Sequence, residues 1–175
     1  WTTGLVPAYL QLEYRGVPGY ESIGSLFTVH NLAYQGRFWH WDMLLTGLDW
    51  KHFHWQQLEY FGQLNLMKAG LIFADAINTV SPRYAEEIQT AEFGEGLQGV
   101  LQHRRASLSG ILNGVDYREW NPLTDPYLAR NYGPENYRDG KSTCKAALQT
   151  ELGLPVKADV PLIGFIGRLA KQKGL

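Results

Sequence analysis

The feature of this sequence that most constrains its fold is an alternation between short apolar runs rich in β-forming residues and segments with a helical period. The predicted strands are 25–29, 76–80 and 108–112, and the predicted helices are 65–74, 83–89 and 97–104. Ser81 and Pro82 are typical of an N-cap and a first helical position. Strands that alternate with helices pair in parallel through right-handed crossovers. The sequence therefore predicts an α/β fold with a parallel sheet.

Further elements are predicted before the first strand and after the last one. A helix is predicted over 5–14, before the first strand. Residues 120–140 are interrupted by prolines and glycines and have no period, which is typical of a linker. A helix over 141–152 and a strand over 161–166 follow, so we expect a second sheet, and with it a second domain, to begin there.

The composition and net charge limit the kinds of molecule that the protein is expected to bind. Of the 175 residues 45% are hydrophobic and 19% are charged, a balance typical of a globular protein with a core. The formal net charge of −1 argues against a nucleic-acid or membrane-surface partner and favours a neutral small molecule. The single cysteine, Cys144, excludes an internal disulfide framework and fits a reducing compartment. We expect a cytoplasmic protein, or a plastid protein if the source is a plant or alga.

Residues 27–36 form the first candidate site. The run changes from β-forming residues to polar ones and ends at a glycine, and His30 and Asn31 fall at the carboxyl end of the predicted strand. In open parallel sheets, ligands bind in the crevice beyond the carboxyl ends of the strands. His30 is therefore placed to meet a substrate. The alternative is a hydrogen-bonded loop histidine with no ligand.

Residues 161–174 repeat this design, with an apolar run followed by glycines and cations. Gly167 would let the backbone approach a phosphate closely, and Arg168 and Lys173 could donate charge-assisted hydrogen bonds to it. An ordinary solvated exit from a sheet has the same composition, so both interpretations stay open.

The stretch from Arg37 to Gly62 has no clean period and is crowded with aromatic and histidine residues. His52 and His54 could share a face of a strand, but no third ligand follows at a spacing typical of a metal site. We expect a packed, partly exposed aromatic insertion and no metal.

Three motifs occur in order: residues 28–36, residues 111–116 with 120–122, and residues 167–169 with 172–174. Together they resemble the bacterial glycogen synthase and plant starch synthase family, and the similarity runs through most of the chain. The resemblance implies a GT-B type glycosyltransferase with two Rossmann-like domains facing a cleft. It implies an internal fragment whose parts are the end of the first, catalytic domain (1–122), a linker (123–140) and the start of the nucleotide-sugar-binding domain (141–175).

The resemblance also implies the reaction, which is transfer of glucose from ADP-glucose to the non-reducing end of an α-1,4-glucan with retention. The implied catalytic residues are His30, Arg168 and Lys173. The implied substrate-binding residues are Asn31, Tyr34, Gln35, Asn113 and Gly167. Two protein cations can stabilise the departing diphosphate, so neither a metal nor a cofactor is expected. The fragment alone is expected to be inactive, because the donor must be held by both domains.

Two alternatives remain open. A related GT-B transferase with another donor or acceptor would share the glycine and cation motif. A non-catalytic carbohydrate-binding module would explain the aromatic content without chemistry. A nicotinamide dehydrogenase fits poorly, because no Gly-x-Gly-x-x-Gly follows a strand.

Overall fold

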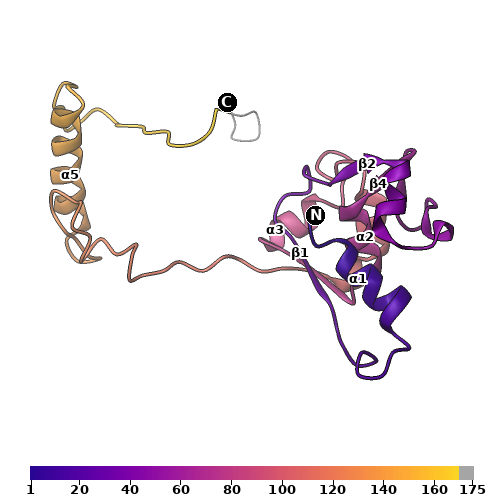
Figure 1. Cartoon of the computed structure of the whole chain (residues 1–175). Helices are drawn as coiled ribbons and strands as arrows, with labels where there is room; N and C mark the ends of the chain where they lie inside the picture. The colour runs from indigo at the N-terminus through magenta and orange to yellow at the C-terminus, as the bar shows by residue number, and fades with distance from the viewer. Residues whose placement is uncertain (170–175) are drawn as a thin grey trace. The chain divides into compact units, whose positions relative to one another are not determined.

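The computed structural model describes residues 1–169, and their contacts divide the chain into two compact units, Trp1–Asn113 and a second unit that begins at Gly114 (Figure 1). Each unit is described by itself. Among the described residues, the first unit contains both sheets and all of the helices except the longest one, α5, which belongs to the second.

A parallel sheet forms the centre of the first unit. It consists of β1 (Leu26–Val29), β5 (Ala76–Thr79) and β6 (Leu108–Gly110), in the order β1-β5-β6. Both neighbouring pairs are parallel, with Phe27 opposite Ile77 and Ile77 opposite Leu108. The predicted α/β fold with a parallel sheet is confirmed.

The helices that connect these strands are α2 (Leu66–Phe73), α3 (Pro82–Glu87) and α4 (Gln98–His103), each within two residues of its predicted ends. The single-turn 3-10 helix η4 (Arg105–Ser107) leads into β6. Ser81 is the N-cap of α3, as predicted, and its hydroxyl accepts from the Tyr84 N–H at 3.2 Å.

Among the described residues, one face of the parallel sheet is buried in the core. Side chains alternate along a strand, so Phe27 and Ile77 enter the core, whereas Leu26 on the other face is 63% exposed. Helices α2 and α4 cover the packed face. The buried core residues are Phe27, Val29, Leu32, Met67, Leu71, Ala74, Ile77, Ile88, Leu97 and Leu101.

A second, antiparallel sheet has two strands in the stretch 37–62, for which no period was expected, and its third strand directly after that stretch. Its strands are β2 (Arg37–Trp39), β4 (Gln63–Asn65) and β3 (Glu59–Tyr60), in the order β2-β4-β3. Strands of two or three residues are too short to show alternation in sequence, which is why they were missed.

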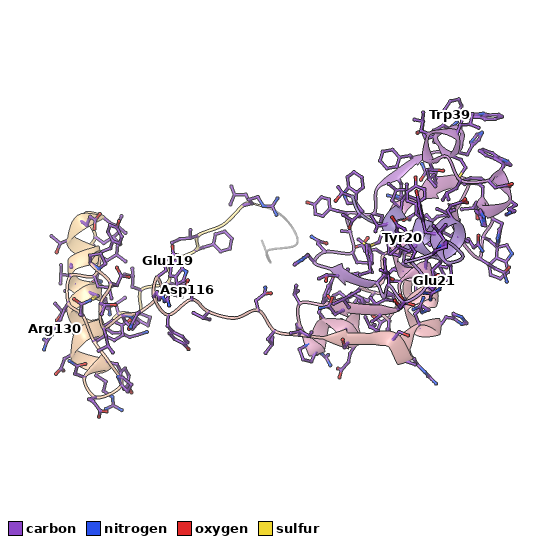
Figure 2. All side chains as sticks on the ribbon, turned by 60° about the horizontal axis from the view of Figure 1, so that its bottom comes forward. Tyr20, Glu21, Trp39, Asp116, Glu119 and Arg130 are labelled. Carbon is purple, nitrogen blue, oxygen red and sulfur yellow. The ribbon has the colours of Figure 1, made fainter. Side chains whose placement is uncertain are left out.

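The 3-10 helices η2 (His40–Thr46) and η3 (Trp50–His52) connect β2 to β3. The expectation of a partly exposed aromatic insertion is confirmed there, since Trp41 stacks on Trp50 while Trp39 is 63% exposed. Figure 2 shows Trp39 at the rim of this unit.

The predicted helix over 5–14 is present as α1 (Leu5–Tyr9) followed by the π-helical turn η1 (Leu10–Tyr14). It packs against α2, and Gly4 makes this approach possible, because a Cβ there would overlap the Leu66 carbonyl. A second buried cluster joins α1, α2 and the antiparallel sheet. Its members are Ala8, Met43, Leu48, Leu58, Leu64 and Ala69.

The second unit contains α5 (Tyr137–Glu151), which begins four residues before the predicted helix and so enters the predicted linker. Gly153, at φ 66°, follows its end as expected. The prediction of a strand over 161–166 is wrong. A strand needs a neighbouring strand for its backbone hydrogen bonds, and the described part of this unit contains none. No helix among the described residues is long and apolar enough to cross a membrane.

Candidate functional site

The carboxyl ends of the parallel strands place two of the predicted site residues at one edge of the sheet. His30 follows the end of β1, and Asn113 lies three residues beyond β6. Both side chains are exposed. Because β5 lies between β1 and β6, the two outer strands are two spacings apart, about 10 Å. The structure thus brings His30 and Asn113 to the edge where ligands of such sheets bind.

The backbone around His30 is fixed on both sides. The Thr79 hydroxyl donates to the Val29 carbonyl at 2.7 Å, and the Leu32 N–H donates to the Tyr84 hydroxyl oxygen at 3.1 Å. Both partners come from the neighbouring β5 and α3 segment, about 50 residues along the chain. The imidazole is therefore presented to solvent from a rigid position.

A tight turn follows His30. The Asn31 side-chain oxygen accepts from the Ala33 N–H at 3.0 Å, and the Tyr34 N–H points to the Asn31 carbonyl at 3.4 Å. The Tyr34 side chain is 55% exposed. An exposed aromatic face on the turn that follows His30 can pack against a sugar ring.

Gln35 faces the interior rather than the edge of the sheet. It is only 5% exposed, and its amide nitrogen donates to the Glu95 carbonyl at 2.8 Å. Its amide oxygen accepts from the side chain of Asn65 at 2.7 Å. Asn65 is fully buried and is also the N-cap of α2, accepting from the Lys68 N–H at 2.9 Å. Gln35 therefore ties the site loop to the start of a core helix.

The end of the site loop docks onto the same helix through its backbone. The Met67 N–H donates to the Gln35 carbonyl at 2.9 Å, and the Leu66 N–H donates to the Gly36 carbonyl at 3.1 Å. The first N–H groups of a helix have no partner within the helix. The loop supplies those partners, so the loop and α2 hold each other in place.

Glu95 is a candidate functional residue that the sequence analysis did not identify. It adopts a left-handed conformation, φ 49°, which is uncommon for a residue other than glycine, and its side chain is exposed. Its carbonyl accepts from Gln35 and also from the Tyr60 hydroxyl, the latter at 3.0 Å. The only sequence signal was a glycine-containing turn, because the partners that hold this conformation lie far away in the chain.

The predicted phosphate-binding residues belong to the second unit. Gly167 and Arg168 are exposed and lie outside any helix or strand. Lys173 lies outside the described residues. The described site therefore consists of the edge of the first unit's parallel sheet.

The described residues offer no group of three or more histidine, cysteine, aspartate or glutamate side chains that could hold a metal ion. His52 is 8% exposed, and its Nδ1 lies 2.8 Å from the Gln57 side-chain oxygen. This histidine has a structural hydrogen bond in the interior.

Residues 1–103 match the protein family described as "Starch synthase catalytic domain". The glycogen synthases of an Anaeromyxobacter species and of Pseudothermotoga lettingae are each 50% identical to this chain over 175 residues. That alignment covers the whole chain but 37% and 36% of the two relatives, so the chain spans just over a third of their length.

A solved structure of a starch synthase is also similar to this chain. The catalytic domain of starch synthase IV from Arabidopsis thaliana, bound to ADP and acarbose, is 36% identical to this chain, with a TM-score of 0.72. The match covers 88% of this chain and 32% of the plant protein. The resemblance that the three motifs indicated is confirmed.

Proposed function

The chain belongs to the family of starch synthase catalytic domains, and on that premise we propose that it is part of a glycogen or starch synthase with a GT-B fold. The proposed reaction transfers glucose from ADP-glucose to the non-reducing end of an α-1,4-glucan, with retention. The observation that carries the proposal is 50% identity to glycogen synthases over the entire chain. The proposed location is the cytoplasm, or the plastid if the source is a plant or alga.

His30 and Asn113 hold hydroxyl groups of the donor glucose in this proposal. Both are exposed at the carboxyl edge of the parallel sheet, and their hydrogen bonds would fix the anomeric carbon against the acceptor. Asn31 and Tyr34, on the same turn, complete the sugar side of the site. Orientation of this kind lowers the barrier because the reacting groups no longer lose freedom on the way to the transition state.

Gln35 was expected to bind substrate, but its burial and its two internal hydrogen bonds favour a different role. We assign it as a positioning residue that keeps the His30 loop on α2 and fixes the Glu95 carbonyl. Its effect on catalysis would then pass through the loop that it holds.

The leaving group is a nucleoside diphosphate, on which negative charge grows as the glycosidic bond breaks. Arg168, beside Gly167, and Lys173, beside Gly174, supply the positive charge that stabilises this state more than the ground state. The donor is thus held by two domains, 1–122 and the domain that begins at 141, joined by the linker 123–140. The fragment alone is inactive in this proposal.

The test uses the intact enzyme that contains this sequence. It is incubated with ADP-glucose and maltoheptaose, and the products are analysed by chain length and by NMR of the new anomeric centre. Extension by α-1,4-linked glucose supports the proposal. Transfer from UDP-glucose in preference to ADP-glucose would favour a related transferase, and glucan binding without transfer or ADP affinity would favour a binding module.

A further inference from the structure

A cavity of about 850 Å³ lies in the first unit. Its walls come from β3 and the hairpin loop after it, from α2 and α4, and from residues 55–56 and 96–97, which precede β3 and α4. None of the predicted site residues lines it. A cavity of this volume falls in the range that binds small molecules and short oligomers.

The two cations in the cavity wall donate hydrogen bonds to backbone carbonyl groups. The Lys68 ammonium donates to the Trp55 carbonyl and, at 2.5 Å, to the Glu59 carbonyl. The Arg104 guanidinium donates to carbonyls at the end of α2, among them Leu71 at 3.0 Å and Ala74 at 2.5 Å. Burial lowers the pKa of Lys68, an effect that Glu59 partly opposes. Hydrogen-bond donors of both cations are therefore engaged by the protein itself, which leaves fewer of them for an anion such as a phosphate.

Aromatic rings stand at the rim of the cavity. Phe61 is 85% exposed and Trp55 is 73% exposed, and both line it. Tyr60 packs edge-on against Phe61, with ring centroids 4.8 Å apart. These faces are large and apolar, yet they are open to solvent.

Phe61 occupies a backbone position that does not suit it. It forms the two-residue loop of the hairpin with Gly62, and both have positive φ, 47° and 78°. Such loops favour asparagine followed by glycine, because a left-handed conformation is costly for a bulky side chain. The ring is thus held outward at a cost in stability, and strain of this kind is concentrated at functional positions.

Hydrogen-bonding groups complete the lining. Glu59 accepts from the Gly62 N–H at 2.6 Å through one oxygen, and a carboxylate has further lone pairs for hydroxyl donors. Gln56 and His103 also line the cavity. Aromatic faces bind the C–H faces of sugar rings, and amide, carboxylate and imidazole groups bind sugar hydroxyls. We propose that this cavity is a second binding site for an α-1,4-glucan chain, separate from the catalytic edge; this rests on the proposed function.

The cavity adjoins the catalytic loop through one carbonyl group. Tyr60, in the cavity wall, donates to the Glu95 carbonyl, and Gln35 of the His30 loop donates to the same atom. A glucan held in the cavity is consequently tethered beside the catalytic edge without entering it. Such a tether raises the local concentration of chain ends of a polymer, but does nothing for an acceptor too short to reach both sites.

The test compares two acceptors in the intact enzyme carrying Phe61→Asn, Trp55→Ala or both. Asparagine tolerates the left-handed conformation, so Phe61→Asn removes the ring and keeps the turn. We expect each single variant to raise the KM for glycogen about two- to tenfold, from the value of one aromatic contact. The kcat/KM for maltotriose should stay at the parental value. Tyr127→Asn, at a side chain that is 95% exposed outside the cavity, is the matched control.

Affinity electrophoresis in glycogen gels, without ADP-glucose, measures binding independently of catalysis. Weaker retention of the cavity variants supports the site, and parental retention and KM in both would overturn it while leaving the transferase proposal intact. An equal rise in KM for maltotriose would also overturn it, because the cavity would then belong to the catalytic acceptor path. If the parent transfers no glucose, the proposed function fails, yet retention lost only in the cavity variants would still support glucan binding there.

Discussion

The two segments predicted to carry the chemistry, 27–36 and 161–174, resemble each other in sequence but differ in structure. The first contains β1, which pairs with β5, and its loop is fixed by hydrogen bonds to α2 and Tyr84. In the second, the described residues form no strand, and Ile163 and Ile166 are 91% and 103% exposed. The difference shows that an apolar run followed by polar residues forms a strand only where partner strands satisfy the hydrogen bonds of its backbone.

The largest expected effect concerns the chain of 175 residues by itself. We predict that it transfers no detectable glucose from ADP-glucose to glycogen, because the donor diphosphate needs a folded second site segment. Incorporation of labelled glucose into glycogen is the measurement. A measurable rate would contradict both the two-domain site and the contrast between the segments.

Next in size is the loss of a phosphate-binding cation from the intact enzyme. Lys173→Gln should reduce kcat by about 100- to 1000-fold, the usual result of removing one donor to a developing negative charge, and should change donor affinity less. Arg168→Lys should also lose activity although it keeps the positive charge, because an ammonium cannot reproduce the planar guanidinium. Steady-state rates within about twofold of the parent would identify both residues as solvated surface cations.

The anchor of the first segment, 27–36, is the hydrogen bond from the Asn65 side chain to the Gln35 amide oxygen. Asn65→Ala leaves that buried oxygen without its donor, so the free energy of unfolding should fall by about 1–3 kcal/mol. We expect a lower free energy of unfolding in urea and a reduced kcat, because the His30 loop loosens. Ser81→Ala is the control, since it removes the N-cap of α3 rather than that of α2. Equal effects of the two variants on kcat would argue against a specific role for the anchor.

His30→Ala tests the exposed tip of the same loop. Loss of one neutral hydrogen bond costs about 0.5–1.5 kcal/mol, so kcat should fall about two- to twelvefold. Free ADP should bind as tightly as before, as isothermal titration can measure. If both quantities fall together, His30 acts on the nucleotide or on the scaffold.

The smallest expected effect concerns the start of β1. Hydrogen bonds from the Ser25 N–H and hydroxyl, with a smaller contribution from Arg15, hold the pKa of Asp75 below its ordinary value. The carboxylate therefore stabilises the fold above the unfolded pKa of about 3.9, and this contribution is lost as the pH falls through the lower folded value. Because the site is partly exposed, Asp75→Asn should cost less than about 1 kcal/mol at pH 7, and the urea midpoints of variant and parent should converge as the pH falls below the folded pKa of Asp75. A difference that persists at low pH would show that the charge is not the cause.

The sequence by itself determined the order and type of the strands of the parallel sheet and of the helices that connect them, but not the antiparallel sheet. Helical period, alternating apolar residues and the cap at Ser81 act over a few residues, so they could be recognised without a fold. The position of His30 at the end of a strand followed from the same local pattern. So did the family, because its three motifs are short and contiguous.

Only the tertiary structure decided which side chains at that edge are free to act. Gln35 is buried because Asn65 and Glu95 bond to its amide from 30 and 60 residues away, and no local pattern encodes such partners. The left-handed conformations of Phe61 and Glu95 are likewise fixed by a hairpin register and by distant hydrogen bonds. The run over 161–166 has the composition of a strand, but a strand exists only where another backbone accepts its hydrogen bonds.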